Sequence, residues 1–260
     1  MIWDELAANG HTVVDLPGQQ QLFDQARAFF DRPPDAKLRH STEDWNFGYR
    51  AQGHEYGITP DRPDLNEVFT YWSDDPSLVP NHELIGEFLG ALRAYWHQAG
   101  TAARTVLDAV AAHFEVENTV DFLKSSHIQI NDYRSAGETR DLLQDSHEDG
   151  HLITLLTADG PGLEIVRPDG VSVPRIEPGQ VLVMAGSVLT AMTGGAVEPV
   201  YHQVRNHRLD RRVSIMYFVN PDVGAPITPF VHNEHNAGVD IADQVRRNPE
   251  KYGLPPLQGV

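Results

Sequence analysis

Two histidines and one acidic residue occur in an order that could bind a divalent metal ion. His147 and Asp149 are separated by a single residue, and His202 follows further along the chain. Two imidazoles and one carboxylate can occupy one face of an octahedral metal and leave the opposite positions open, which suits a non-haem Fe(II) centre. Arg212 and Ser214 come shortly after His202, and their donors could hold a dicarboxylate co-substrate.

The same segment contains a rival pattern for zinc. His147, Glu148 and His151 satisfy H-E-x-x-H, in which two histidines at i and i+4 of a helix bind zinc and the glutamate acts as general base. This pattern needs a helix, because only a helical period brings i and i+4 onto one face. The Asp149-Gly150 pair disfavours a helix interior, and the short apolar run 152–157 predicts a strand. A zinc hydrolase is therefore the less favoured alternative.

Strand geometry favours one choice of ligands in this segment. Side chains alternate along a strand, so positions 147 and 149 point the same way while 148 points oppositely. His151 is expected to have a hydrogen-bonded structural role at the start of the next strand. His207 lies in a polar turn, so His202 is preferred as the second histidine.

The elements that must position these residues are mostly short strands. Turn signals separate stretches of β-forming residues, and Asp169-Gly170 indicates a hairpin. Many short strands of this kind predict a mainly β sandwich or barrel with helices packed outside. The predicted strands are 128–133, 152–157, 163–166, 171–173, 180–185, 200–204 and 212–219.

The first part of the chain predicts helices and a long loop. Apolar spacing predicts a helix over 22–30, which Pro33-Pro34 ends, and helices over 82–114 with an interruption near Gly100. Residues 41–80 are rich in Gly, Pro, Asp and Trp and are predicted to form a long loop. The aromatic side chains of this loop offer apolar surface, so we expect part of it to cover the active site.

Composition limits the partners. The chain has 260 residues, no cysteine and a formal net charge of −17, so thiolate metal sites are excluded and nucleic acid and anionic membranes should be repelled. The first basic residue is Arg27 and no apolar run is long enough to span a bilayer, which leads us to expect a cytoplasmic protein. The sequence does not predict an oligomeric state.

Several motifs occur in an order and spacing that resemble one family. The chain resembles the iron(II) and 2-oxoglutarate dependent oxygenases of the isopenicillin N synthase-like family almost from end to end. The motifs that carry the resemblance include Gly48-Tyr49-Arg50, His147-Glu148-Asp149, Gly162-Leu163-Glu164-Ile165, Pro178-Gly179-Gln180-Val181-Leu182-Val183, His202-Gln203-Val204, Arg212-Val213-Ser214 and Phe218-Val219-Asn220-Pro221. Two positions depart from the pattern, because Gln203 and Arg134 stand where the family commonly has Arg and Pro.

The resemblance implies a fold and a set of site residues. The expected fold is a double-stranded β-helix, a cupin-like jelly-roll. The expected cofactors are Fe(II), 2-oxoglutarate as co-substrate, and O2. The expected metal ligands are His147, Asp149 and His202, and the residues expected to hold 2-oxoglutarate are Arg212, Ser214, Tyr133 and Asn131.

The predicted activity is oxidation of a C–H bond in a small polar metabolite, by hydroxylation, desaturation or oxidative ring closure. A bacterial natural-product or antibiotic tailoring step is the expected context, and the acidic surplus suggests an amino-sugar substrate. An O2-dependent oxidase that does not use 2-oxoglutarate is the second alternative besides the zinc hydrolase. We expect a single domain over 1–260, with a helical and loop part over 1–125 that roofs the core, a jelly-roll core over 126–222 and a C-terminal extension over 223–260.

Overall fold

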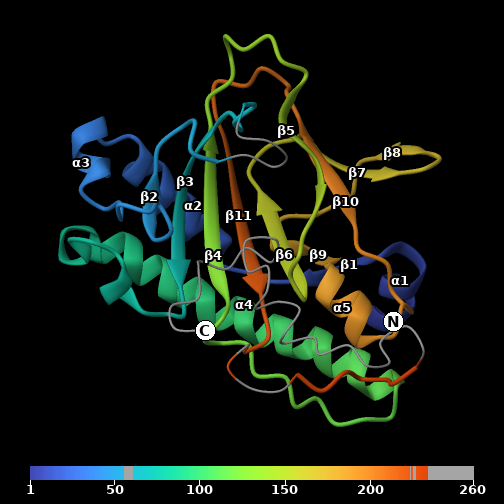
Figure 1. Ribbon diagram of the computed structural model, residues 1–260. Helices are drawn as coiled ribbons and strands as arrows, with labels where there is room; N and C mark the ends of the chain where they lie inside the picture. The colour runs from blue at the N-terminus through green and yellow to red at the C-terminus, as the bar shows by residue number, and fades with distance from the viewer. Residues whose placement is uncertain (56–60, 223, 225–226, 234–260) are drawn as a thin grey trace.

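The core of the computed structural model consists of two antiparallel sheets (Figure 1). The structure describes residues 1–55, 61–222, 224 and 227–233, so most of the predicted C-terminal extension lies outside the described residues. Strand order is β1-β9-β6-β11-β4-β3-β2 in the larger sheet and β5-β10-β7-β8 in the smaller sheet. The strands are β1 (His11–Asp15), β2 (Gly48–Arg50), β3 (Asn66–Trp72), β4 (His127–Tyr133), β5 (Leu142–Glu148), β6 (Ile153–Ala158), β7 (Leu163–Arg167), β8 (Gly170–Ser172), β9 (Gln180–Ala185), β10 (Tyr201–Arg205) and β11 (Arg212–Val219).

Strand β11 shows how the sequence separates the two faces of the larger sheet. Because side chains alternate along a strand, residues two apart share a face. Val213, Ile215, Tyr217 and Val219 join the main hydrophobic core that includes the helices. Met216 and Phe218 pack instead against residues of β7 and β9, between the two sheets. The interior between the sheets is therefore reached only by every second residue of each strand.

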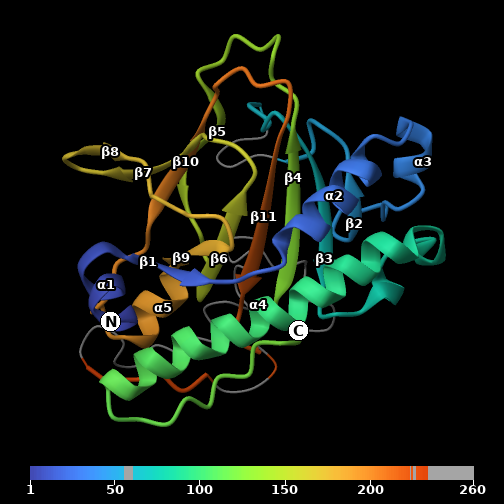
Figure 2. The ribbon, with the colours of Figure 1, turned by 180° about the vertical axis from the view of Figure 1, so that it is seen from behind.

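Helices cover the outer face of the larger sheet (Figure 2). The helices are α1 (Ile2–Asn9), α2 (Gln19–Phe30), α3 (Pro34–Leu38), α4 (Gly86–His113) and α5 (Ser187–Met192), with 3-10 turns η1 (Pro76–Leu78) and η2 (His82–Ile85). No helix among the described residues has both the length and the apolar character that crossing a bilayer demands.

The predicted interruption near Gly100 is wrong, because α4 continues through it from Gly86 to His113. A glycine inside a helix costs only about 1 kcal/mol relative to alanine. Gly100 is buried, and a Cβ at this position would lie 3.7 Å from the hydroxyl of Tyr217 on β11. The close packing of α4 on the sheet therefore outweighs the local preference.

The prediction of a long loop over 41–80 is also wrong, because this segment contributes β2 and β3 to the larger sheet. Strand β3 pairs with β4 along its whole length, from Asn66 opposite Tyr133 to Trp72 opposite His127. The seven predicted strands, by contrast, agree with the structure to within one residue at each end. Strands β1, β2, β3 and β5 were not predicted. β1, β2 and β5 are short or carry many polar residues, whereas β3 is rich in β-forming residues but lies in the segment that was assigned to the long loop.

A network of ion pairs fastens helix α2 to the larger sheet. Asp132 faces outward from β4 and its side chain has no exposed surface. It accepts hydrogen bonds from Arg134 at 3.0 Å and from Arg211 at 2.6 Å. Both arginines also contact Asp31 directly after α2. Arg134 occupies a position where the family commonly has proline. This departure from the family pattern therefore supplies one of the cations of the network.

We expect Asp132→Asn to lower the free energy of unfolding by roughly 1.5–3 kcal/mol, the range for hydrogen bonds to charged groups. Urea denaturation measures this change. Asp31→Asn is the matched control, because the Asp31 side chain is 57% exposed and exposed ion pairs contribute about 1 kcal/mol or less. Equal losses in the two variants would contradict a special role for the buried carboxylate.

Candidate functional site

The two histidines and the aspartate predicted as metal ligands lie together between the sheets. His147 belongs to β5 and His202 to β10, and the two residues are directly opposite in the antiparallel register. Asp149 follows β5. Its Oδ1 lies 3.8 Å from Nε2 of His147 and 3.9 Å from Nε2 of His202. One potential ligand atom from each residue lies within 4.8 Å of the others, which is a geometry that can hold a metal ion.

Hydrogen bonds from the second nitrogen of each ring orient the two imidazoles. Nδ1 of His147 lies 2.8 Å from the carbonyl of Asp145, and Nδ1 of His202 lies 3.3 Å from the carbonyl of Val200. A carbonyl only accepts, so each Nδ1 carries the proton and each Nε2 lone pair is left for a metal. On the third ligand, the hydroxyl of Thr154 donates to Oδ2 of Asp149 at 2.6 Å.

The charges of the three residues suit cation binding. Burial lowers the pKa of His202 to about 4, against the opposing effect of Asp149. Burial alone would raise the pKa of Asp149, but the nearby His202, His151 and His147 together with the Thr154 hydroxyl lower it. His202 is therefore neutral and Asp149 ionised near neutral pH, which is the protonation state that metal ligands require.

A polar cavity of about 30 Å³ adjoins the three residues. One side of it is a hydrogen-bonded chain of side chains on the inner face of β4. Gln129 donates to Asn131 at 3.0 Å, Asn131 to the Tyr133 hydroxyl at 3.1 Å, and Tyr133 to Gln144 of β5 at 3.4 Å. Burial raises the pKa of Tyr133 to about 12, so its hydroxyl remains a neutral donor.

Arg212 brings a buried positive charge to the same cavity. The residue is only 2% exposed, and its Nε donates to the carbonyl of Pro161 at 3.0 Å. Its Nη1 has no hydrogen-bond partner within the described part of the chain. Burial lowers the pKa of Arg212, although Tyr133 and Asp159 act in the opposite direction, and a guanidinium stays charged in proteins. A buried charge with a free donor is costly unless an anion is bound beside it. Ser214, two residues along β11, lines the cavity too.

The zinc-hydrolase pattern is not assembled. His147 lies on a strand rather than a helix, so His151 is not on the same face one turn later. Nδ1 of His151 is instead hydrogen-bonded to the side-chain amide of Asn220, in agreement with the structural role expected for it. His207 is exposed and stands apart from the triad.

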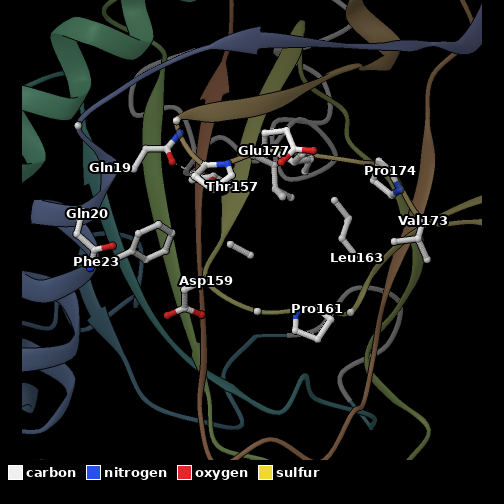
Figure 3. A pocket seen from close by; sticks show the side chains of 18 of the residues that line it. Gln19, Gln20, Phe23, Thr157, Asp159, Pro161, Leu163, Val173, Pro174 and Glu177 are labelled. Atoms are coloured by element: carbon white, nitrogen blue, oxygen red, sulfur yellow. Dashed lines mark hydrogen bonds between the residues drawn. The ribbon is translucent and has the colours of Figure 1, made fainter.

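A larger cavity lies elsewhere and contains none of the triad (Figure 3). Its volume is about 680 Å³, and it is formed by α2, the turn after β6 and the segment that precedes β9. Figure 3 shows Phe23, Thr157 and Leu163 pointing into it. Only Leu156 lines both cavities. The metal-binding geometry lies at the smaller cavity, so we take the smaller cavity as the candidate site.

Three residues of the site were not identified from the sequence. Gln129 shares its strand face with Asn131 and Tyr133, so strand alternation could have indicated it. Thr154 is in phase with the inward positions of the predicted strand 152–157, but nothing in the sequence places it beside Asp149. Gln144 gave no signal, because β5 was not predicted.

A family model adds the observation that decides the class of protein. The model of the 2OG-Fe(II) oxygenase superfamily matches residues 125–221, which contain the triad, Tyr133 and Arg212. This segment is a 2OG-Fe(II) oxygenase domain. The protein is an Fe(II)- and 2-oxoglutarate-dependent dioxygenase with a jelly-roll core, as the sequence motifs predicted.

Similar proteins cover most of the oxygenase. It is 27% identical to the 2-oxoglutarate-dependent dioxygenase citB of Monascus ruber, over 82% of this chain and 73% of that protein. It is 25% identical to gibberellin 2-beta-dioxygenase 4 of Arabidopsis thaliana, over 84% of this chain and 72% of that protein. The crystal structure of a Neurospora crassa protein in complex with alpha-KG and thymine superposes with a TM-score of 0.71 at 21% identity, covering 95% of this chain and 89% of that one.

The residues present fit the cofactors of this superfamily, which are Fe(II), 2-oxoglutarate and O2. Two neutral nitrogen donors and one carboxylate oxygen form the donor set that suits non-haem Fe(II). The buried guanidinium with an unpartnered Nη1 suits a carboxylate of the co-substrate.

We expect Thr154→Val to weaken metal binding about tenfold, because it removes the hydrogen bond that orients Asp149 and losses of outer-shell partners fall in this range. Isothermal titration with Co(II) measures the dissociation constant. Thr157→Val makes the same chemical change three residues along β6, where the side chain bonds Gln19 instead. The interpretation fails if both variants bind Co(II) equally well.

Proposed function

We propose that the oxygenase oxidises a C–H bond of a small polar metabolite at a ferrous ion held by His147, Asp149 and His202. The convergence of these three ligand atoms from β5 and β10 is the observation that carries the proposal. When bound, the iron and 2-oxoglutarate supply the oxidising power and release succinate and CO2. The protein contributes binding, orientation and exclusion of water.

The co-substrate is proposed to lie in the small cavity beside the triad. Arg212 and Ser214 on β11 and Tyr133 on β4 would bind its distal carboxylate, since an arginine fork can donate two parallel hydrogen bonds. Asn131 would approach the end that binds the metal. The cavity has a volume of only about 30 Å³, so a dicarboxylate requires side chains to move. Gln129 and Gln144 are flexible amides on its wall and are the expected ones to do so.

The reaction type and the substrate are finer proposals. Hydroxylation, desaturation and ring closure all begin with removal of a hydrogen atom, so the triad does not distinguish them. Relatives carry names that refer to gibberellin, and the similar Neurospora crassa structure contains thymine, which supports a small molecule as substrate. The bacterial natural-product step rests on the family resemblance, and the amino-sugar substrate rests on the acidic composition. A substrate panel must therefore include neutral, acidic and basic metabolites.

The test of this function is the coupling of 2-oxoglutarate to turnover. Protein, Fe(II) and 2-oxoglutarate mixed without oxygen should give a weak visible charge-transfer band. Addition of O2 with a substrate should then form succinate in step with the oxidised product. Product formation without succinate would support an oxidase that does not use 2-oxoglutarate, and the complete absence of the band would contradict the proposal.

We expect Arg212→Lys to raise the KM for 2-oxoglutarate at least tenfold while Co(II) affinity stays unchanged. Lysine keeps the positive charge but lacks the planar fork that pairs with a carboxylate, and the loss of one charge-assisted hydrogen bond, roughly 1.5–3 kcal/mol, corresponds to a factor of at least ten. Succinate formation at varied 2-oxoglutarate measures KM. A normal KM would show that another residue binds the co-substrate.

We also propose that residues 1–260 form one domain, in which 126–222 provide the jelly-roll and 1–125 pack on it. Strands β1, β2 and β3 support this arrangement, because each pairs within the larger sheet. Helices α2 and α4 bury apolar side chains in the same hydrophobic core as β11. Removal of residues 1–125 would therefore expose the outer face of the sheet, and we propose that the core needs them to fold.

A further inference from the structure

One buried histidine near the triad lacks the hydrogen bond that a buried polar group needs. His127, the first residue of β4, is 3% exposed. Its Nδ1 has no hydrogen-bond partner among the residues that the structure describes. A buried nitrogen without a partner costs free energy, so such a group in a native protein calls for an explanation such as a bound ligand.

Other buried histidines of the chain do have partners. Nδ1 of His151, in the same aromatic cluster as His127, is hydrogen-bonded to Asn220. Nδ1 of His40, 1% exposed and in another part of the chain, lies 2.9 Å from the carbonyl of Pro80. The missing partner is therefore particular to the position of His127 and not common to the buried histidines of this fold.

The strand register places His127 on a line that starts at the metal site. Thr154 of β6, which donates to Asp149, is opposite Phe218 of β11. Phe218 is opposite His127, and His127 is opposite Trp72 of β3. Neighbouring strands are about 4.8 Å apart, so His127 stands two strands, or about 10 Å, from Thr154. This separation matches the reach of a small metabolite whose reacting carbon lies over the iron.

The surroundings hold the ring in place and set its charge. The imidazole stacks on Trp72 with ring centroids 4.0 Å apart, and Phe218 lies 4.7 Å away on the line towards the triad. Burial, with smaller contributions from His151 and Arg50, lowers the pKa of His127 well below the ordinary value, so the ring is neutral. A neutral imidazole has one N–H donor, which suits an oxygen acceptor beside it.

We propose that His127 anchors the substrate, with its Nδ1–H donating a hydrogen bond to a carbonyl or carboxylate oxygen of the molecule that is oxidised. This inference rests on the proposed function and names the chemistry of one substrate group. The apolar faces of Trp72 and Phe218 fix the ring, so the anchor is rigid. A substrate whose group at this point is an ammonium, as in an amino-sugar bound through its amine, is disfavoured.

A fragment titration tests the anchor without knowledge of the substrate. Protein labelled with 15N-histidine and loaded with Zn(II) and 2-oxoglutarate is titrated with acetamide, acetate and methylammonium. We expect acetamide and acetate to shift the His127 Nδ1 resonance, and methylammonium to leave it in place. Unchanged resonances with both oxygen acceptors, or an equal shift with methylammonium, would overturn the proposal.

Stability measurements provide the second test. His127→Phe removes no hydrogen bond of Nδ1 to the described residues, so its Tm should equal or exceed that of the unmodified chain. His40→Phe is the matched control and should melt at a lower temperature, because it loses the bond to Pro80. An equal loss in both variants would show that His127 has a structural role and would overturn the anchor.

The two proposals can fail separately. The anaerobic band with Fe(II) and 2-oxoglutarate reports the ferrous site, and it should be the same in His127→Phe as in the unmodified chain. Its absence from the unmodified chain would contradict the proposed function alone, since the fragment and melting measurements need no redox chemistry at the metal.

Discussion

The antiparallel register between β5 and β10 is the constraint on which the site depends. It places His147 directly opposite His202, and the strand then ends so that Asp149 can turn towards both Nε2 atoms. A slip of one residue would turn one imidazole to the other face of the sheet, because side chains alternate with a period of two. The packed interior between the sheets makes such a slip unfavourable, since it would expose Leu143 and Val204 as well.

The pairing of the strands around the candidate site also buries polar groups. Three polar residues on the inner face of β4, Gln129, Asn131 and Tyr133, form a hydrogen-bonded chain that continues to Gln144 of β5, where a jelly-roll interior would otherwise be filled with apolar side chains. Arg212 completes this wall with a charge that is shielded from water. Polar networks of this kind are stabilising only when their members are satisfied. Nη1 of Arg212 has no partner in the described part of the chain, which indicates where an anion would bind.

The outer face of the larger sheet packs against the helices. Apolar residues of β11 and α4 form one core, and the buried Asp132 joins α2 to the sheet through Arg134 and Arg211. Gln203, the other departure from the family pattern, also faces outward and donates to Glu164 of β7. Both departures therefore change the outer surface of the jelly-roll and leave the inward positions of β4 and β10 as they were.

The sequence by itself predicted the candidate metal ligands that the structure brings together, and it determined which side chains share a strand face. The members of each candidate pair are two residues apart: His147 and Asp149, Asn131 and Tyr133, and Arg212 and Ser214. Residues two apart on a strand point to the same face, and this alternation is a local property that requires no knowledge of the fold. The seven strands rich in β-branched residues were predictable for the same reason. The family motifs then supplied the jelly-roll and the cofactors.

Only the tertiary structure decided what depends on pairing between distant segments. Strand β5 is largely polar and exists because β10 offers it a hydrogen-bonding edge. Strand β3 is rich in β-forming residues, but only its pairing with β4 places it in the larger sheet. Thr154 meets Asp149, and His127 meets Trp72, through contacts that no spacing in the chain specifies. Burial sets the charge of His202 and leaves Nη1 of Arg212 without a partner among the residues described, and burial arises only when both sheets and the helices have come together.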